Sequence, residues 1–165
     1  MRQLEGLFVF LLGMAVHWIW STRFALWGLA PMIPLVLTIA VASRNGSVAG
    51  ECYGFAWGLF LDMLGMHVFG ASALGLTLVG YFVGTLRRNM DLASLPSQLM
   101  LVAGLTPLFL LFYGTMGLVF EHRFLWVGWK LLLLTPLCNC LVAPFCFAVV
   151  HRFVRSGRTN EMDLS

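Results

Sequence analysis

The sequence predicts an all-α integral membrane protein, built as a bundle of six transmembrane helices. Hydrophobic residues make up 60% of the chain and charged residues only 10%, with a mean hydropathy of +0.89, whereas soluble domains carry about 25% charged residues. Six apolar runs, each close to the roughly 20 residues that a helix needs to cross a bilayer, alternate with short polar connections. We therefore expect a single membrane domain over residues 1–165, without a separate soluble domain.

The expected spans have approximate bounds at residues 5–21, 24–43, 47–66, 70–87, 98–120 and 125–153. No small-residue cleavage site separates the first run from the second, which favours a membrane helix over a signal peptide. The sixth run is longer than a bilayer requires, so its helix must tilt, kink or emerge. The polar residues 155–165 that follow it are expected to form a flexible cytoplasmic tail.

Prolines mark particular points in these helices. Pro31 and Pro34 lie near the start of the second helix, where their missing N–H groups matter least. Pro107 lies inside the fifth helix and is expected to kink it, with Thr106 or neighbouring helices replacing the lost hydrogen bond.

The third span is the helix around which we expect the others to pack. At about 100° per residue, its small and acidic residues gather on one side and its bulky residues, including Trp57 and Phe60, occupy much of the rest. A carboxylate in mid-membrane costs about 2.5 to 3.5 kcal/mol, so Asp62 should face other helices or a wet cavity. The small side contains Gly50, Glu51, Gly54, Gly58, Asp62 and Gly65.

The fourth span carries a second small-residue face. Its members recur at spacings of three and four residues, and they are Gly70, Ala73, Thr77, Gly80 and Gly84. Because the connection to the third span is short, the two helices should be antiparallel neighbours that pack through these faces. The alternative, that glycine is simply common in membrane helices, explains the number of glycines but not their phase.

The charges predict the topology. Six spans place both ends of the chain on one side, and seven of the ten basic residues fall on that side: Arg2, Arg44, Arg87, Arg88, Arg152, Arg155 and Arg158. Basic residues concentrate on the cytoplasmic side of membrane proteins, so both termini should be cytoplasmic. An aromatic belt at the opposite interface is expected from Trp18, Trp20, Trp27, Trp126 and Trp129.

Asp62 and Lys130 are expected at similar depth in the outer half of the membrane. One hypothesis is a buried ion pair between them, because either charge alone is costly in the membrane. The alternative is that Lys130 extends to the membrane surface and that Asp62 is neutral or hydrated. No nucleophile elbow, zinc-protease motif or phosphate loop occurs in the sequence, so we expect neither an enzyme nor a cofactor or metal site.

A longer pattern resembles a known family. The run GFAWGLFLDMLG, from Gly54 to Gly65, gives G-x-x-x-G-x-x-x-D, and it is followed by Gly70 and by LVGYFVGTLRRN. Together with Asn139 and Pro144 in the last span and a basic C-terminal end, this pattern resembles the MreD family of bacterial rod shape-determining proteins. The resemblance covers most of the chain, including its length, its six spans and its cytoplasmic termini.

The resemblance implies a non-enzymatic, multi-pass subunit of the elongation machinery in the bacterial cytoplasmic (inner) membrane. Such a subunit binds the bitopic protein MreC and is linked through it to the MreB filament and to the peptidoglycan synthases. Membrane lipids are expected partners and nucleic acid is not. The partner helix is expected to dock on the lipid-facing apolar surface, with Trp57 among the candidates.

The MreD family is also similar in fold to the substrate-binding subunits of energy-coupling-factor transporters, which supplies an alternative. In that case the chain is a small-solute-binding subunit whose Asp62, Asn139 and proline-broken helices line an outward-facing cavity. A closed apolar cavity near Asp62 favours the scaffold, and an open polar cavity favours the binder. Structural roles are expected for Gly50, Gly54, Gly58, Asp62, Gly80, Gly84, Lys130, Asn139 and Pro144.

Overall fold

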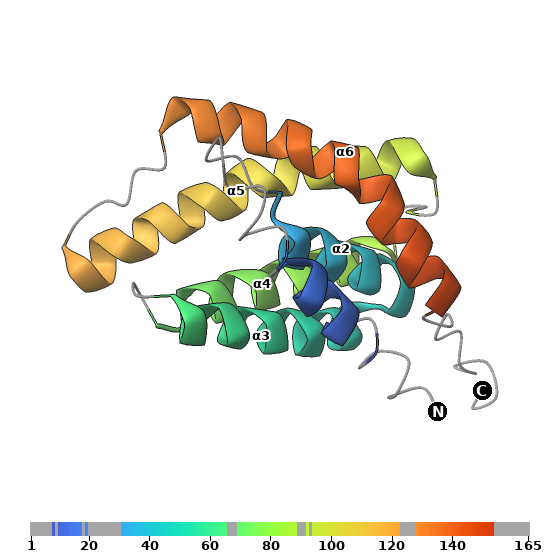
Figure 1. Cartoon of the computed structure of the whole chain (residues 1–165), viewed down its shortest axis with the longest axis horizontal. Helices are drawn as coiled ribbons and strands as arrows, with labels where there is room; N and C mark the ends of the chain where they lie inside the picture. The colour runs from blue at the N-terminus through green and yellow to red at the C-terminus, as the bar shows by residue number, and fades with distance from the viewer. Residues whose placement is uncertain are drawn as a thin grey trace.

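The computed structural model describes residues 8, 10–17, 19, 31–65, 69–88, 92, 94–122 and 128–153. Every regular element among them is helical, so the prediction of an all-α chain is confirmed for the described residues (Figure 1). An N-terminal helical segment, residues 8, 10–17 and 19, precedes five bounded helices. These are α2 (Ile33–Asn45), α3 (Ser47–Leu64), α4 (Ala71–Leu86), α5 (Leu95–Glu121) and α6 (Trp129–Phe153).

The bounds of α3 to α6 lie close to the expected ranges, but α2 begins at Ile33 rather than near residue 24. Residues 24–30, the ends of the first expected span and the tail 155–165 lie outside the described residues. Helix α2 has Pro34 in its first turn, as expected from the freedom of that turn from intrahelical N–H bonds. It ends at Gly46, whose φ of 92° lets the chain reverse directly into α3.

Helix α2, not α3, is the centre of the bundle. Every residue from Ile33 to Ala42 is buried, and α3, α4, α5 and α6 all contact this helix. The reason lies in its composition, because a helix that is apolar on all sides is most stable when all of its sides are buried. Thr38 is the exception, and its hydroxyl donates a hydrogen bond of 2.8 Å to the carbonyl oxygen of Pro34.

The other helices form two antiparallel pairs around α2 (Figure 1). Helices α3 and α4 lie side by side on one side of it, and α5 and α6 lie on the other. Helix α6 changes direction in the half that contains Pro144, where proline removes one intrahelical N–H bond. This bend agrees with the expectation that the long sixth helix is not straight.

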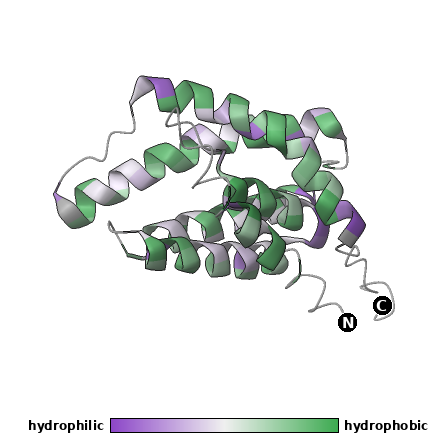
Figure 2. Cartoon of the chain, viewed as in Figure 1, coloured by the Kyte–Doolittle hydropathy of each residue, from purple (hydrophilic) through white to green (hydrophobic). Residues whose placement is uncertain are grey.

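The outside of the bundle is apolar. Large hydrophobic side chains are exposed on every bounded helix around α2, and Figure 2 shows hydrophobic colouring along these helices, with the strongest hydrophilic colouring at helix ends. Two helices, Leu95–Phe120 and Trp129–Arg152, are long and apolar enough to cross a membrane. The helices Ile33–Asn45 and Ala71–Leu86 are apolar but shorter.

The described basic residues are unevenly placed. Arg44, Arg87 and Arg152 lie at the C-terminal ends of α2, α4 and α6, which share one end of the bundle (Figure 1). Lys130 begins α6 at the opposite end, and Trp129 beside it is 68% exposed. Arg88 follows Arg87 directly after α4. The other basic residues, Arg2, Arg23, Arg123, Arg155 and Arg158, and four of the tryptophans expected in the belt lie outside the described residues.

Candidate functional site

Among the described helices, α3 and α4 make the most extensive contact, and glycines make it possible. Gly50, Gly54 and Gly58 are all buried on the side of α3 that faces α4. A Cβ added to Gly50 would lie 2.8 Å from the carbonyl oxygen of Gly80, and one added to Gly58 would overlap the main chain of Ala73. The two small-residue faces therefore lie against each other in the phase that the sequence predicts.

The contact continues to the other end of the pair. A Cβ on Gly84 would overlap the main chain of Ser47, and one on Gly80 would overlap the carbonyl group of Gly50. Thr77, which was expected on this face, is half-buried, and its hydroxyl donates to the carbonyl oxygen of Ala73 at 2.6 Å. Glycine therefore brings the two backbones together along the length of both helices.

Asp62 is buried at the end of this interface, with 7% of its surface exposed. Its carboxylate accepts three backbone hydrogen bonds, from Gly70 at 3.0 Å, Ser72 at 3.1 Å and Ala73 at 3.0 Å. These N–H groups open α4, whose own N-cap is a glycine without a side chain. The carboxylate of α3 therefore caps α4, and its negative charge is stabilised by the positive end of the α4 helix dipole.

The hypothesis of an ion pair between Asp62 and Lys130 is wrong for this structure. Lys130 is exposed in the first turn of α6, while the hydrogen bonds that the Asp62 carboxylate makes with the described residues all come from the main chain. The physical reason is that the start of α4 is close to Asp62 along the chain, whereas Lys130 is far from it. The N–H groups at the start of α4 follow Asp62 by only eight to eleven residues, and they satisfy the buried charge without a second charged side chain.

Asn139 is the second buried polar centre, with 0% of its surface exposed. From α6, its Oδ1 accepts the N–H of Met32 at 2.7 Å, at the start of α2. Its Nδ2 donates to Thr106 Oγ1 on α5 at 3.0 Å, and the Thr106 hydroxyl donates to the carbonyl oxygen of Val102 at 2.6 Å. One side chain thus joins three helices, since α2, α5 and α6 meet at its amide.

The expected role of Thr106 beside Pro107 needs correction. The acceptor that Pro107 leaves free is the carbonyl of residue 103, four residues earlier, whereas the Thr106 hydroxyl bonds to Val102. Thr106 therefore serves the contact with Asn139 and does not replace the bond that proline removes.

The Asn139–Thr106 bond gives a first testable prediction. Thr106→Val is expected to lower the free energy of unfolding by about 1 kcal/mol, because it keeps the shape of the side chain but leaves the Asn139 amide without its acceptor. Thr115→Val is the matched control, since Thr115 is exposed on the same helix and bonds only to Phe112. It should change the free energy by less than about 0.5 kcal/mol. Unfolding titrations in mixed micelles measure both, and equal values would show that the buried bond contributes nothing.

The sequence analysis expected Trp57 on the lipid-facing side. This expectation is wrong, because the Trp57 side chain is 0% exposed. The N-terminal helical segment covers it: the rings of Phe10 and Trp57 are 4.8 Å apart between centroids, and those of His17 and Trp57 6.4 Å. A Cβ on Gly13 would lie 3.0 Å from the Trp57 ring. Trp57 is therefore a core residue and is excluded as a docking residue.

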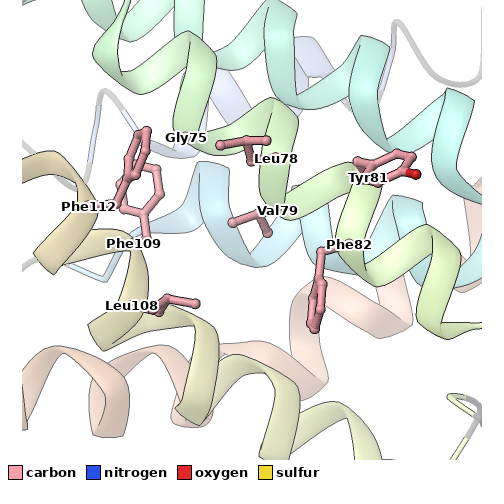
Figure 3. Close-up of a pocket in the computed structure, with 8 residues that line it drawn as sticks. All are labelled: Gly75, Leu78, Val79, Tyr81, Phe82, Leu108, Phe109 and Phe112. Atoms are coloured by element: carbon pink, nitrogen blue, oxygen red, sulfur yellow. The ribbon is translucent and has the colours of Figure 1, made fainter. Parts of the chain in front are cut away.

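An apolar groove of about 290 Å³ opens between α4 and α5 (Figure 3). Its lining residues are Gly75, Leu78, Val79, Tyr81 and Phe82 from α4 and Leu108, Phe109 and Phe112 from α5. A smaller one of about 50 Å³ lies between the N-terminal segment, α2 and α6. Neither groove is lined by Asp62 or Asn139.

Helix α6 presents a ridge that the sequence analysis missed. We define the α6 ridge as Trp129, Leu133, Leu137, Leu141 and Phe145, which recur every four residues and are 68%, 66%, 69%, 82% and 68% exposed. The spacing is visible in the sequence, but spacing does not tell whether neighbouring helices cover it. Pro144, beside the ridge, is exposed as well.

A scan against protein-family models and searches of curated proteins and of solved structures find no match to this chain. Among the described residues, no group of three or more His, Cys, Asp or Glu side chains is placed to hold a metal ion. Lys130 and Pro144 are not brought together with Asp62 or Asn139 at one site. The outside of the described helices includes the α6 ridge and the groove between α4 and α5.

Proposed function

We propose that this chain is a multi-pass protein of the bacterial cytoplasmic membrane and a non-enzymatic scaffold of the MreD kind. In this role it binds an MreC-like bitopic protein and helps to organise lateral peptidoglycan synthesis and cell shape. One observation carries the proposal: the buried side chains of Asp62 and Asn139 hold helices to one another, while the outside of the bundle is apolar and carries an exposed ridge.

The membrane location is supported by the way that the surface is built. Soluble monomers rarely expose apolar patches larger than a few hundred Å², whereas here Tyr81, Leu118, Leu141 and many other large side chains are more than half exposed around the bundle. The arginines gathered at one end suggest the orientation, since basic residues favour the cytoplasmic side. The ends of α2, α4 and α6 would then face the cytoplasm.

The scaffold is favoured over the small-solute binder by the state of the polar side chains. A solute site needs polar groups that point into a cavity. The Asp62 carboxylate instead accepts hydrogen bonds from three main-chain N–H groups. The Asn139 amide accepts one from Met32 and donates one to Thr106. The grooves described above are lined mainly by hydrophobic residues and contain neither side chain.

The α6 ridge is the surface we assign to the partner helix. Side chains spaced by four residues form the ridges that pack into the grooves of a second helix. From Trp129 to Phe145 the ridge is about 24 Å long at 1.5 Å per residue, which is most of the roughly 30 Å of a bilayer's hydrocarbon core. Successive ridge residues turn about 40° around α6, so a single membrane-crossing helix would cross the ridge obliquely and contact its central part, around Leu137 and Leu141.

The test is a pull-down of the tagged full-length chain from its native membrane in mild detergent. We expect a single-span MreC-like protein together with wall-synthesis proteins. The double variant Leu137→Ala/Leu141→Ala should reduce recovery of this partner about tenfold, because buried side chains near the centre of an interface dominate affinity. The control double variant Leu74→Ala/Leu118→Ala removes two leucines, 52% and 51% exposed, from α4 and α5 and should leave recovery unchanged.

Three results would contradict the proposal. Equal recovery with both double variants would remove the ridge as the docking surface. An ATP-binding transport module recovered in place of a single-span protein would favour the transporter alternative. A tightly bound small solute with no protein partner would favour it too.

A further inference from the structure

The groove between α4 and α5 is small and apolar, which suits a flexible hydrocarbon chain better than a whole helix. Its volume of about 290 Å³ is at the lower end of small-ligand sites, roughly 300 to 1,000 Å³, and a helix with its side chains is about 10 Å across. At Gly75 the two helices are in close contact, since a Cβ there would come within 2.8 Å of Phe109. Figure 3 shows Leu108, Phe109 and Phe112 of α5 across from the α4 residues.

The side of α4 along this groove leads to a positive charge. Tyr81, at the edge of the groove, is followed on the same face of α4 by Thr85, and Arg88 comes three residues later in the turn after the helix ends at Leu86. All three are exposed, and the Arg88 guanidinium bonds to no group in the described part of the chain. Arg87 lies elsewhere, because its Nη1 is 3.8 Å from where a Cβ on Gly46 would be.

The spacing between groove and charge matches one leaflet of a bilayer. Arg88 lies about 10 Å beyond Tyr81 and about 20 Å beyond Gly75, at 1.5 Å per residue. One leaflet contributes about 15 Å of hydrocarbon. With Arg88 at the level of the headgroups, the part of the groove from Leu78 to Phe82 therefore lies within the hydrocarbon of the same leaflet, and Gly75 lies near the middle of the bilayer. On the orientation proposed above this is the cytoplasmic leaflet, which carries anionic lipids.

We propose that this protein has a site for one anionic phospholipid, with an acyl chain in the α4–α5 groove and the phosphate bound by Arg88. The groove supplies the apolar contact, and the charge selects an anionic headgroup over a zwitterionic one. The proposal rests on the membrane location proposed above, but it does not depend on the MreC-like partner or on the α6 ridge.

Native mass spectrometry of the full-length protein in mild detergent tests the site. The probes are phosphatidylglycerol and phosphatidylcholine with identical acyl chains. We expect wild-type protein to bind phosphatidylglycerol more tightly. Arg88→Gln should weaken phosphatidylglycerol binding about tenfold and remove the preference, because a charge-assisted hydrogen bond is lost. Leu78→Trp should weaken binding of both lipids, because the indole fills the groove.

Two control variants separate this site from general lipid contact. Arg152→Gln removes a different exposed arginine from the same basic end of the bundle, and Leu74→Trp adds an indole to the same helix outside the groove. Both should bind phosphatidylglycerol within about twofold of wild type. An effect of Arg152→Gln equal to that of Arg88→Gln would overturn the proposal, as would equal wild-type affinity for the two lipids or no effect of Leu78→Trp.

The pull-down described above separates this proposal from the proposed function. Leu137→Ala/Leu141→Ala should lose the protein partner and keep the lipid, and Leu78→Trp should do the reverse. A protein partner that is lost with Leu78→Trp but retained with the ridge variant would assign the groove to protein and overturn the lipid site. Loss of the lipid site alone would leave the scaffold proposal intact.

Discussion

Gly58→Ala is expected to lower the free energy of unfolding by about 3 kcal/mol or more, the upper range for overpacking in a well-packed core. The added Cβ would overlap the main chain of Ala73 and the carbonyl oxygen of Ser72. Main-chain atoms cannot rotate away as a flexible side chain can, so α3 and α4 would have to separate. The separation also pulls Asp62, one turn further along α3, away from the N–H groups that it caps.

An unfolding titration in mixed micelles, followed by tryptophan fluorescence, measures this effect. Gly104→Ala is the matched control, because Gly104 is an exposed helical glycine with no neighbouring atom within 4 Å of an added Cβ. Alanine costs less conformational entropy than glycine in a helix, so this variant should be neutral or more stable by about 0.5 kcal/mol. If both variants lose the same stability, the close contact of α3 and α4 is not what holds the bundle together.

Asp62→Ala is expected to cost about 3 kcal/mol, because it leaves three buried N–H groups at the start of α4 without an acceptor. Asp62→Asn should cost less, about 1 to 2 kcal/mol, since one side-chain oxygen still accepts while the negative charge is lost. In both variants the first turn of α4 should exchange its amide hydrogens faster. Hydrogen exchange resolved to Ser72 and Ala73 checks the site directly, and the unfolding titration checks the magnitude.

The same experiment decides between the cap and the ion pair suggested by the sequence. Lys130→Met should change stability by less than about 0.5 kcal/mol, because Lys130 is exposed. In the Asp62→Asn background its effect should be the same within about 0.5 kcal/mol. Rescue of Asp62→Asn by Lys130→Met would instead show that the two charges interact.

The positions of the helices and the phase of α3 against α4 were predictable from local properties of the chain. Apolar runs of sufficient length predict helices, and small residues at spacings of three and four predict a face for close packing. Gly50, Gly54 and Gly58 therefore point to the correct side of α3 before any neighbour is known. The partner face on α4 follows because a short connection leaves an antiparallel neighbour as the simplest arrangement.

The partners of individual side chains were not predictable in the same way. Periodicity gives the side of a helix on which Trp57 lies, but the N-terminal segment that buries it could pack elsewhere. Asp62 was expected to need a partner in the membrane. The N–H groups at the start of a helix stabilise its charge as a lysine would, and no residue type in the sequence marks which helix end will lie beside it. The bond between Thr106 and Asn139 could not be predicted from Thr106 alone, because it forms only when the fold brings the Asn139 amide within hydrogen-bond distance.

By itself, the sequence determined an apolar all-α chain, the approximate helix positions and the glycine face of α3, because each depends on composition and spacing within one segment. Only the tertiary structure decided that α2 is central, that Asp62 caps α4 and that Asn139 joins three helices. It also decided which apolar faces stay uncovered, among them the α6 ridge and the groove beside Tyr81. The physical reason is that these features depend on which segments are in contact, and these contacts are set by the packing of the whole bundle.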